Sequence, residues 1–106
     1  MPSFNPVAKT SEISDPGSML VEVDDRLVVL IQAAGHYYAL DDVCTHDGGP
    51  LSDGPVSGEE STIACPRHGA KFDVKTGAAV SMPATKGTIA HEVKVDGDQI
   101  FVQLSN

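Results

Sequence analysis

The stretch MLVEVDDRLVVLIQAAGHYYAL, residues 19–40, decides the fold class because short apolar runs alternate in it with two-residue turns. Three runs rich in β-branched, leucine and tyrosine residues cover residues 19–23, 26–33 and 36–40. Such residues favour strands. Asp24-Asp25 and Ala34-Gly35 separate the runs and are typical of tight turns. The stretch therefore predicts three consecutive antiparallel strands.

Outward from this stretch the same pattern recurs, and no window shows a capped amphipathic helix. Further strands are expected at residues 61–65, 88–95 and 99–104. Asp96-Gly97-Asp98 joins the last two as a hairpin turn. Thr10 opens a segment that permits one short helical turn before Pro16-Gly17 stops it. The sequence predicts an all-β fold, a small antiparallel sandwich or barrel.

Length and composition indicate a single globular domain over residues 1–106, with 41% apolar and 21% charged residues. No run is long enough to span a membrane and the first residues lack a secretion signal, so we expect a cytoplasmic protein. We also expect it to be a monomer. The formal net charge of −8 argues against nucleic acid and anionic membranes as partners. Acidity serves solubility, docking onto a basic partner, or both.

The two cysteines each lie close to a histidine, in segments unlike strands. Residues 41–59, rich in Gly, Pro, Asp and Ser, form a predicted long loop that carries Cys44 and His46. A second loop begins at Cys65 and carries His68. Long loops in small domains usually serve a function or bind a ligand.

Three interpretations of these four residues are open. A disulfide between the cysteines is uncommon in a reducing compartment. A structural zinc site is disfavoured by spacing, because one residue separates Cys44 from His46 and two separate Cys65 from His68. The interleaved order Cys, His, Cys, His favours a two-iron cluster in which one iron takes both thiolates and the other both imidazoles.

CTH at residues 44–46 followed by CPRH at residues 65–68 resembles the paired ligand loops of the Rieske family. The resemblance extends over about residues 4 to 104. It implies an all-β Rieske domain with a cluster-binding subdomain at about residues 41–80 and one [2Fe–2S] cluster. By this likeness Cys44 and Cys65 ligate the buried iron, and His46 and His68 ligate the more exposed one.

Departures from the high-potential members of the family predict a low reduction potential. Those members carry an extra cysteine in each loop, whereas this chain has Arg67 within CPRH and no further cysteine. They also place a serine and a tyrosine, whose hydroxyls bond the sulfurs, where this chain has Ala70 and Phe72. Since neither side chain donates a hydrogen bond, we expect a midpoint near about −150 mV.

A lone, acidic, low-potential Rieske domain resembles the Rieske-type ferredoxins of bacterial systems that hydroxylate aromatic rings. The likeness implies a one-electron carrier between an NAD(P)H-dependent flavoprotein ferredoxin reductase and a terminal Rieske oxygenase, with no catalytic residue of its own. Pro66 and Leu51 are expected in its docking patch. The alternatives are a small Rieske-like subunit of an assimilatory nitrite reductase and a zinc-stabilised or redox-sensing binding module.

Other residues near these motifs have simpler expected roles. Gly48, Gly49 and Gly69 are expected to let the backbone turn tightly and approach the cluster where a Cβ would collide. His36 and His91 lie inside strand-like runs and have no cysteine neighbour, so both are interpreted as structural or surface residues.

Overall fold

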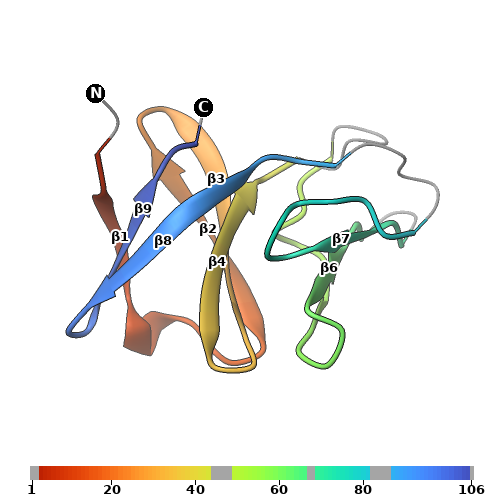
Figure 1. The fold of residues 1–106 in the computed structure, drawn as a ribbon, viewed down its shortest axis with the longest axis horizontal. Helices are drawn as coiled ribbons and strands as arrows, with labels where there is room; N and C mark the ends of the chain where they lie inside the picture. The colour runs from red at the N-terminus through yellow and green to blue at the C-terminus, as the bar shows by residue number, and fades with distance from the viewer. Residues whose placement is uncertain (1–2, 44–48, 67–68, 82–86, 106) are drawn as a thin grey trace.

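The computed structural model describes residues 3–43, 49–66, 69–81 and 87–105. Within these ranges the chain forms two antiparallel sheets, which lie side by side in Figure 1. The larger sheet contains β1 (Asn5–Lys9), β2 (Gly17–Val23), β3 (Arg26–Ala33), β4 (His36–Asp41), β8 (Ala90–Asp96) and β9 (Gln99–Gln103). Its strand order is β1-β9-β8-β4-β3-β2, and the two outer strands contact each other, so the sheet nearly closes into a barrel. The all-β prediction is confirmed.

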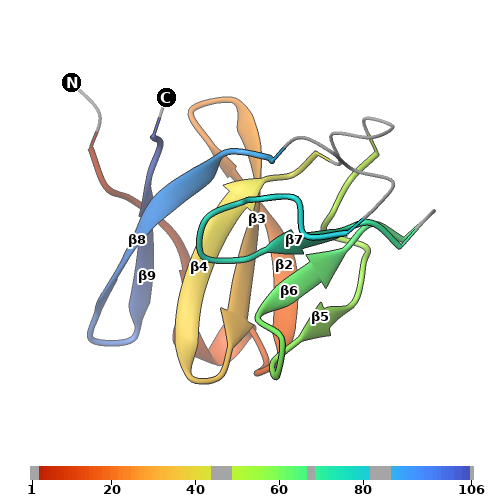
Figure 2. The same cartoon turned by 45° about the vertical axis from the view of Figure 1, so that its right-hand side comes forward.

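The smaller sheet contains β5 (Val56–Ser57), β6 (Thr62–Ala64) and β7 (Lys71–Asp73), in that order. Figure 2 shows these three short strands lying against one side of the larger sheet. A turn of 3₁₀ helix, η1 (Thr10–Glu12), joins β1 to β2. The predicted short helical turn is therefore confirmed, although its N-cap residue is Lys9 rather than Thr10. Among the described residues no helix is long and apolar enough to cross a membrane.

The central stretch folds as its pattern indicates. Strand β2 pairs with β3 and β3 with β4, both antiparallel. Asp24 and Asp25 connect the first pair with φ of 49° and 66°, and Ala34 and Gly35 connect the second with φ of 51° and 81°. Both turns thus place two residues in the left-handed region, which suits the twist of a two-residue hairpin. In the β8–β9 hairpin turn only one residue, Gly97 with φ of 64°, lies in the left-handed region.

The sequence pattern does not predict three of the observed strands, and one of these, β5, contradicts a predicted loop. Strand β5 lies inside residues 41–59, which were expected to form one continuous loop. A strand of two residues is too short to show alternation, and β7 with three residues escapes for the same reason. Strand β1 contains Pro6, which is tolerated because β1 is an edge strand with an irregular register beside it.

Strand β3 is buried on both faces, which explains its nearly continuous apolar sequence. Val28 and Leu30 pack inside the larger sheet with residues of β2, β4 and β9. Val29 and Ile31, on the opposite face, pack against the smaller sheet. Strand β3 therefore contributes side chains to two hydrophobic cores. The smaller sheet packs against the face of the larger sheet that carries Val29 and Ile31.

Candidate metal centre

The four predicted ligands differ in what the structure describes. Cys65 lies directly after β6, at the first position of the second predicted loop. Cys44, His46 and His68 lie outside the described residues. The geometry of the ligand set is therefore built from Cys65 and from the segments that flank the other three residues.

Cys65 begins a tight loop that two backbone hydrogen bonds close. The Cys65 amide donates to the carbonyl of Ala70 at 2.7 Å, and the Gly69 amide donates to the carbonyl of Cys65 at 2.9 Å. Gly69 has φ of 73°, a conformation that favours glycine. Among the described residues no atom lies within 4 Å of a Cβ built at Gly69, so the positive φ is the feature that favours glycine there, and the approach to the cluster stays a prediction. The predicted roles of Gly48 and Gly49 stay predictions, and Gly48 lies outside the described residues.

The Cys65 side chain is buried, with 1% of the residue exposed. It packs in a core cluster with Leu51 from the first loop, Ile63 from β6, and Ala70 and Phe72 from the far side of the second loop. Ala70 and Phe72 are fully buried there, in the same cluster as the thiol. Leu51 is also fully buried, so its predicted place in a docking patch is wrong; the leucine anchors the first loop to the core instead.

The first loop packs directly on the strand that leads to Cys65. The Gly54 amide donates to the Leu51 carbonyl at 2.9 Å, and the Ala64 amide donates to the Pro55 carbonyl at 3.0 Å. A Cβ at Gly54 would collide with the carbonyl oxygen of Ala64, so only glycine fits this crossing. The segments that follow His46 and precede Cys65 are therefore held in contact.

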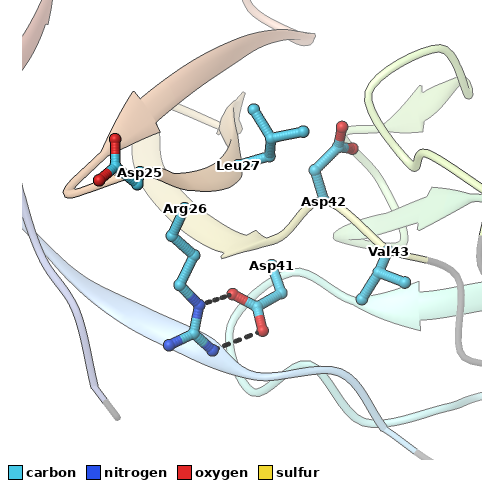
Figure 3. A pocket seen from close by; sticks show the side chains of 6 residues that line it. All are labelled: Asp25, Arg26, Leu27, Asp41, Asp42 and Val43. Carbon is cyan, nitrogen blue, oxygen red and sulfur yellow. Dashed lines mark hydrogen bonds and ion pairs between the residues drawn. The ribbon is translucent and has the colours of Figure 1, made fainter.

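A polar network fixes the end of β4, three residues before Cys44. The Asp41 carboxylate accepts hydrogen bonds from Arg26 Nε at 2.9 Å and Nη2 at 2.7 Å, a two-point ion pair drawn in Figure 3. Its Oδ1 also lies 2.7 Å from His91 Nε2. Burial by itself would raise the pKa of the Asp41 carboxyl, but hydrogen bonds from Arg26 and His91 and the charge of Arg26 hold that pKa below its ordinary value.

His91 is a structural residue, as its place in β8 predicted, with a side chain that is fully buried. The Ser105 amide donates to His91 Nδ1 at 3.0 Å, so that nitrogen carries a lone pair. The imidazole proton is therefore on Nε2, which donates to Asp41. Sequence reasoning did not pair His91 with Asp41 because half of the chain separates them; His36, in contrast, is exposed.

A shallow pocket opens beside this network, where β3 begins and β4 ends. Figure 3 shows the residues that line it: Asp25, Arg26, Leu27, Asp41, Asp42 and Val43. The Arg26 guanidinium and the Asp41 carboxylate engage each other there. The Asp42 side chain points away from that ion pair, and Ser52 donates to its carboxylate through the amide at 2.7 Å and the hydroxyl at 3.1 Å.

The donors around Cys65 suit a thiophilic metal centre. A buried thiol at the mouth of a closed loop, packed against a second loop, is excluded from water and can bind iron as thiolate. No three metal-binding side chains gather among the residues that the structure describes, which hold only one of the four predicted ligands. Cysteine thiolate is the donor that iron–sulfur clusters use, and Cys65 is the one predicted donor that the structure describes.

Comparison with known families gives the same answer. The family model for the Rieske [2Fe-2S] domain matches residues 3–102. The chain belongs to this Rieske family. Its relatives include the ferredoxin component of the naphthalene 1,2-dioxygenase system of Pseudomonas aeruginosa, which is 36% identical over 89% of this chain and 88% of the relative. This relative is the ferredoxin of a dioxygenase system rather than its oxygenase.

Two solved structures resemble the Rieske domain over nearly its whole length. The ferredoxin of carbazole 1,9a-dioxygenase from Nocardioides aromaticivorans IC177 superposes with a TM-score of 0.90 at 30% identity, covering 94% of this chain and 96% of the other. A complex of reduced oxygenase and oxidised ferredoxin in carbazole 1,9a-dioxygenase matches with a TM-score of 0.86 at 30% identity, covering 94% and 92%. The likeness to Rieske ferredoxins therefore extends to both sequence and fold.

Proposed function

We propose that this chain is a Rieske-type ferredoxin whose single [2Fe–2S] cluster is held by Cys44, His46, Cys65 and His68. In this proposal residues 1–106 act as one domain, with the cluster-binding subdomain at about residues 41–80. The support is the family match together with the buried Cys65 thiol in its closed loop. When bound, such a cluster supplies storage for one electron at a potential above that of all-cysteine clusters.

The protein's own residues would shelter the centre and tune it. Leu51 and Phe72 pack with Cys65 and keep water from its sulfur. Ala70 and Phe72 offer no hydroxyl hydrogen bond, so little stabilisation of the reduced state comes from side chains in this wall. A low midpoint reduction potential, about −150 mV, is therefore part of the proposal.

The proposed partners are an NAD(P)H-dependent flavoprotein ferredoxin reductase as donor and a terminal ring-hydroxylating Rieske oxygenase as acceptor. Support for the acceptor comes from the carbazole 1,9a-dioxygenase complex, in which a similar ferredoxin is bound to its oxygenase. The exposure of Pro66 beside the buried Cys65 supports its proposed part in the docking patch. A cytoplasmic location belongs to the same proposal, as do a monomeric state and the absence of nucleic-acid or membrane partners.

Electron transfer between purified components tests this function. The assay combines NADH, a flavoprotein reductase and the oxygenase of a naphthalene 1,2-dioxygenase system, and measures the hydroxylated product. We expect product formation to rise in proportion to the concentration of this chain and to stop when the chain is omitted. A chain that takes up one electron from dithionite but restores no turnover with any reductase and oxygenase pair would contradict the proposed partners.

A further inference from the structure

We propose that Asp42 is a positioning residue for the metal centre, acting as a clasp that closes the segment carrying Cys44 and His46. The inference rests on the proposed function, since it assumes that these two residues are ligands. Asp42 lies two residues before Cys44, and its partner Ser52 lies six residues after His46. The clasp therefore brackets residues 43–51, the part of the chain that supplies half of the ligand set.

Both carboxylate oxygens of Asp42 are used on the same partner. Oδ1 accepts the Ser52 amide at 2.7 Å, and Oδ2 accepts the Ser52 hydroxyl at 3.1 Å. Hydrogen bonds to an ionised acceptor are stronger than neutral ones, and two of them fix the relative orientation as well as the distance. The two ends of the bracketed segment are thus joined by a short, two-point link.

Each end of the clasp is itself attached to the rigid larger sheet. The Asp42 amide donates to the Leu27 carbonyl at 3.1 Å, which fixes Asp42 to the start of β3. The Ser18 hydroxyl donates to the Ser52 carbonyl at 3.3 Å, which ties Ser52 to β2. Leu51, next to Ser52, is fully buried in the core cluster that contains Cys65. The clasp therefore fixes the position of the first loop relative to both the larger sheet and the second loop.

The neighbouring residue Asp41 has a different structural role. The Asp41 carboxylate bonds Arg26 and His91 and so joins β4 to β3 and β8, whereas the Asp42 carboxylate points away from them and accepts from Ser52 in the loop. Partners that orient metal ligands without touching the metal are worth about 10–100-fold in metal affinity. Among the described residues Asp42 is the acidic side chain placed to play that part for the first loop.

The test compares cluster retention in Asp42→Ala, Asp42→Asn and Asp53→Asn, each purified without oxygen. Asp53 is exposed on the same loop, so Asp53→Asn removes an equal charge without touching the clasp. The readout is the rate at which the visible absorbance of the cluster bleaches in excess chelator, with the width of the reduced-state paramagnetic resonance lines as a second signature. We expect Asp42→Ala to lose its cluster about 10-fold faster, with broadened lines, and Asp53→Asn to match the wild type.

Asp42→Asn separates positioning from charge, because it removes the charge but keeps one acceptor oxygen. An intermediate bleaching rate supports the clasp, whereas equal rates for Asn and Ala mean that the carboxylate acts through its charge alone and overturn the inference. If Asp42→Ala does not fold, Asp42→Asn and Ser52→Ala decide: faster loss in both supports the clasp and wild-type rates in both overturn it. A wild-type protein without any [2Fe–2S] signal would instead contradict the proposed function.

Discussion

At the residue scale, the wall around Cys65 sets the environment of the proposed cluster. Ala70 and Phe72 are both fully buried in the core cluster of that thiol. The family resemblance implies hydroxyl-bearing residues at these two positions in high-potential members. A hydrogen bond to a charged group is worth about 1.5 kcal/mol, which corresponds to about 65 mV for a one-electron couple. We expect Ala70→Ser and Phe72→Tyr each to raise the midpoint potential by on the order of 60 mV, as followed by a spectroscopic redox titration.

The matched control for that series is Phe101→Tyr, which adds the same hydroxyl on β9 in the larger sheet. Its midpoint should equal that of the wild type. If Ala70→Ser and Phe72→Tyr also leave the midpoint unchanged, those two side chains do not face the sulfurs, and the explanation of a low potential from missing hydroxyls fails.

Thr88 carries a buried hydroxyl whose oxygen has no hydrogen-bond partner among the residues that the structure describes. A buried polar group without a partner costs about 1–3 kcal/mol of desolvation. Thr88→Val replaces the hydroxyl by a methyl of similar size, so it should raise the free energy of unfolding by about 1 kcal/mol in chemical denaturation. Thr88→Ser, which keeps the hydroxyl and loses a methyl, should lower it; a less stable valine variant would reveal a partner for the oxygen.

At the element scale, the crossing of the first loop over β6 aligns the two ligand segments. Gly54 makes that crossing possible, because a Cβ there would overlap the Ala64 carbonyl oxygen. We expect Gly54→Ala to lower the free energy of unfolding by about 3 kcal/mol and to speed cluster loss, since overpacking must push the loop off the strand.

Gly58→Ala is the control for the crossing, because a Cβ at Gly58 makes only ordinary contact with Pro16 at 3.9 Å. Thermal unfolding of the two variants, followed by circular dichroism, separates crowding at Gly54 from a general effect of replacing glycine in this loop. Equal stability of the two variants would show that the crossing yields to a side chain at little cost.

At the scale of the whole molecule, the Asp41 network ties the ends of three strands of the larger sheet. The pKa of Asp41 is lowered in the folded protein, so the carboxylate stabilises the fold above its unfolded pKa, near 3.8, and that contribution is lost as pH falls through the folded pKa. Asp41→Asn should lower the free energy of unfolding by about 2 kcal/mol at neutral pH. The difference from the wild type should be constant down to about pH 5 and narrow below pH 3.8.

Urea unfolding of both proteins at a series of pH values checks this expectation. A difference that stays constant down to the acid limit would mean that Asp41 stabilises the fold through packing rather than as an ionised acceptor. The side chain of Asp41 is 15% exposed, which keeps the ion pair with Arg26 only weakly screened by salt.

The sequence predicts the larger sheet well because its strands are long and their turns carry strong local signals. Residues 26–33 match β3 to the residue, and the tight turns expected at Asp24-Asp25 and Ala34-Gly35 form there. Strands β5 and β7 could not be found in the same way, because two or three residues pair only when the larger sheet supports them.

The sequence predicts which residues could bind the metal, but not the hydrogen bonds and packing that hold their loops in place. The order and spacing of cysteines and histidines in the two motifs suffice to propose the ligands. Contacts such as Asp42 with Ser52 and Asp41 with His91 depend on tertiary structure, which local sequence patterns do not report. The burial of Leu51 was missed because an apolar residue in a polar loop has no periodicity to place it.

We propose that this Rieske domain carries one low-potential cluster with mixed ligands. Redox-monitored electron paramagnetic resonance of the anaerobically purified protein tests it most directly, because one titration reports both cluster type and potential. We predict a reduced-state signal with an average g below that of all-cysteine clusters and a midpoint near about −150 mV. A strongly positive midpoint, or a colourless protein that contains zinc and gives no signal, would contradict the account.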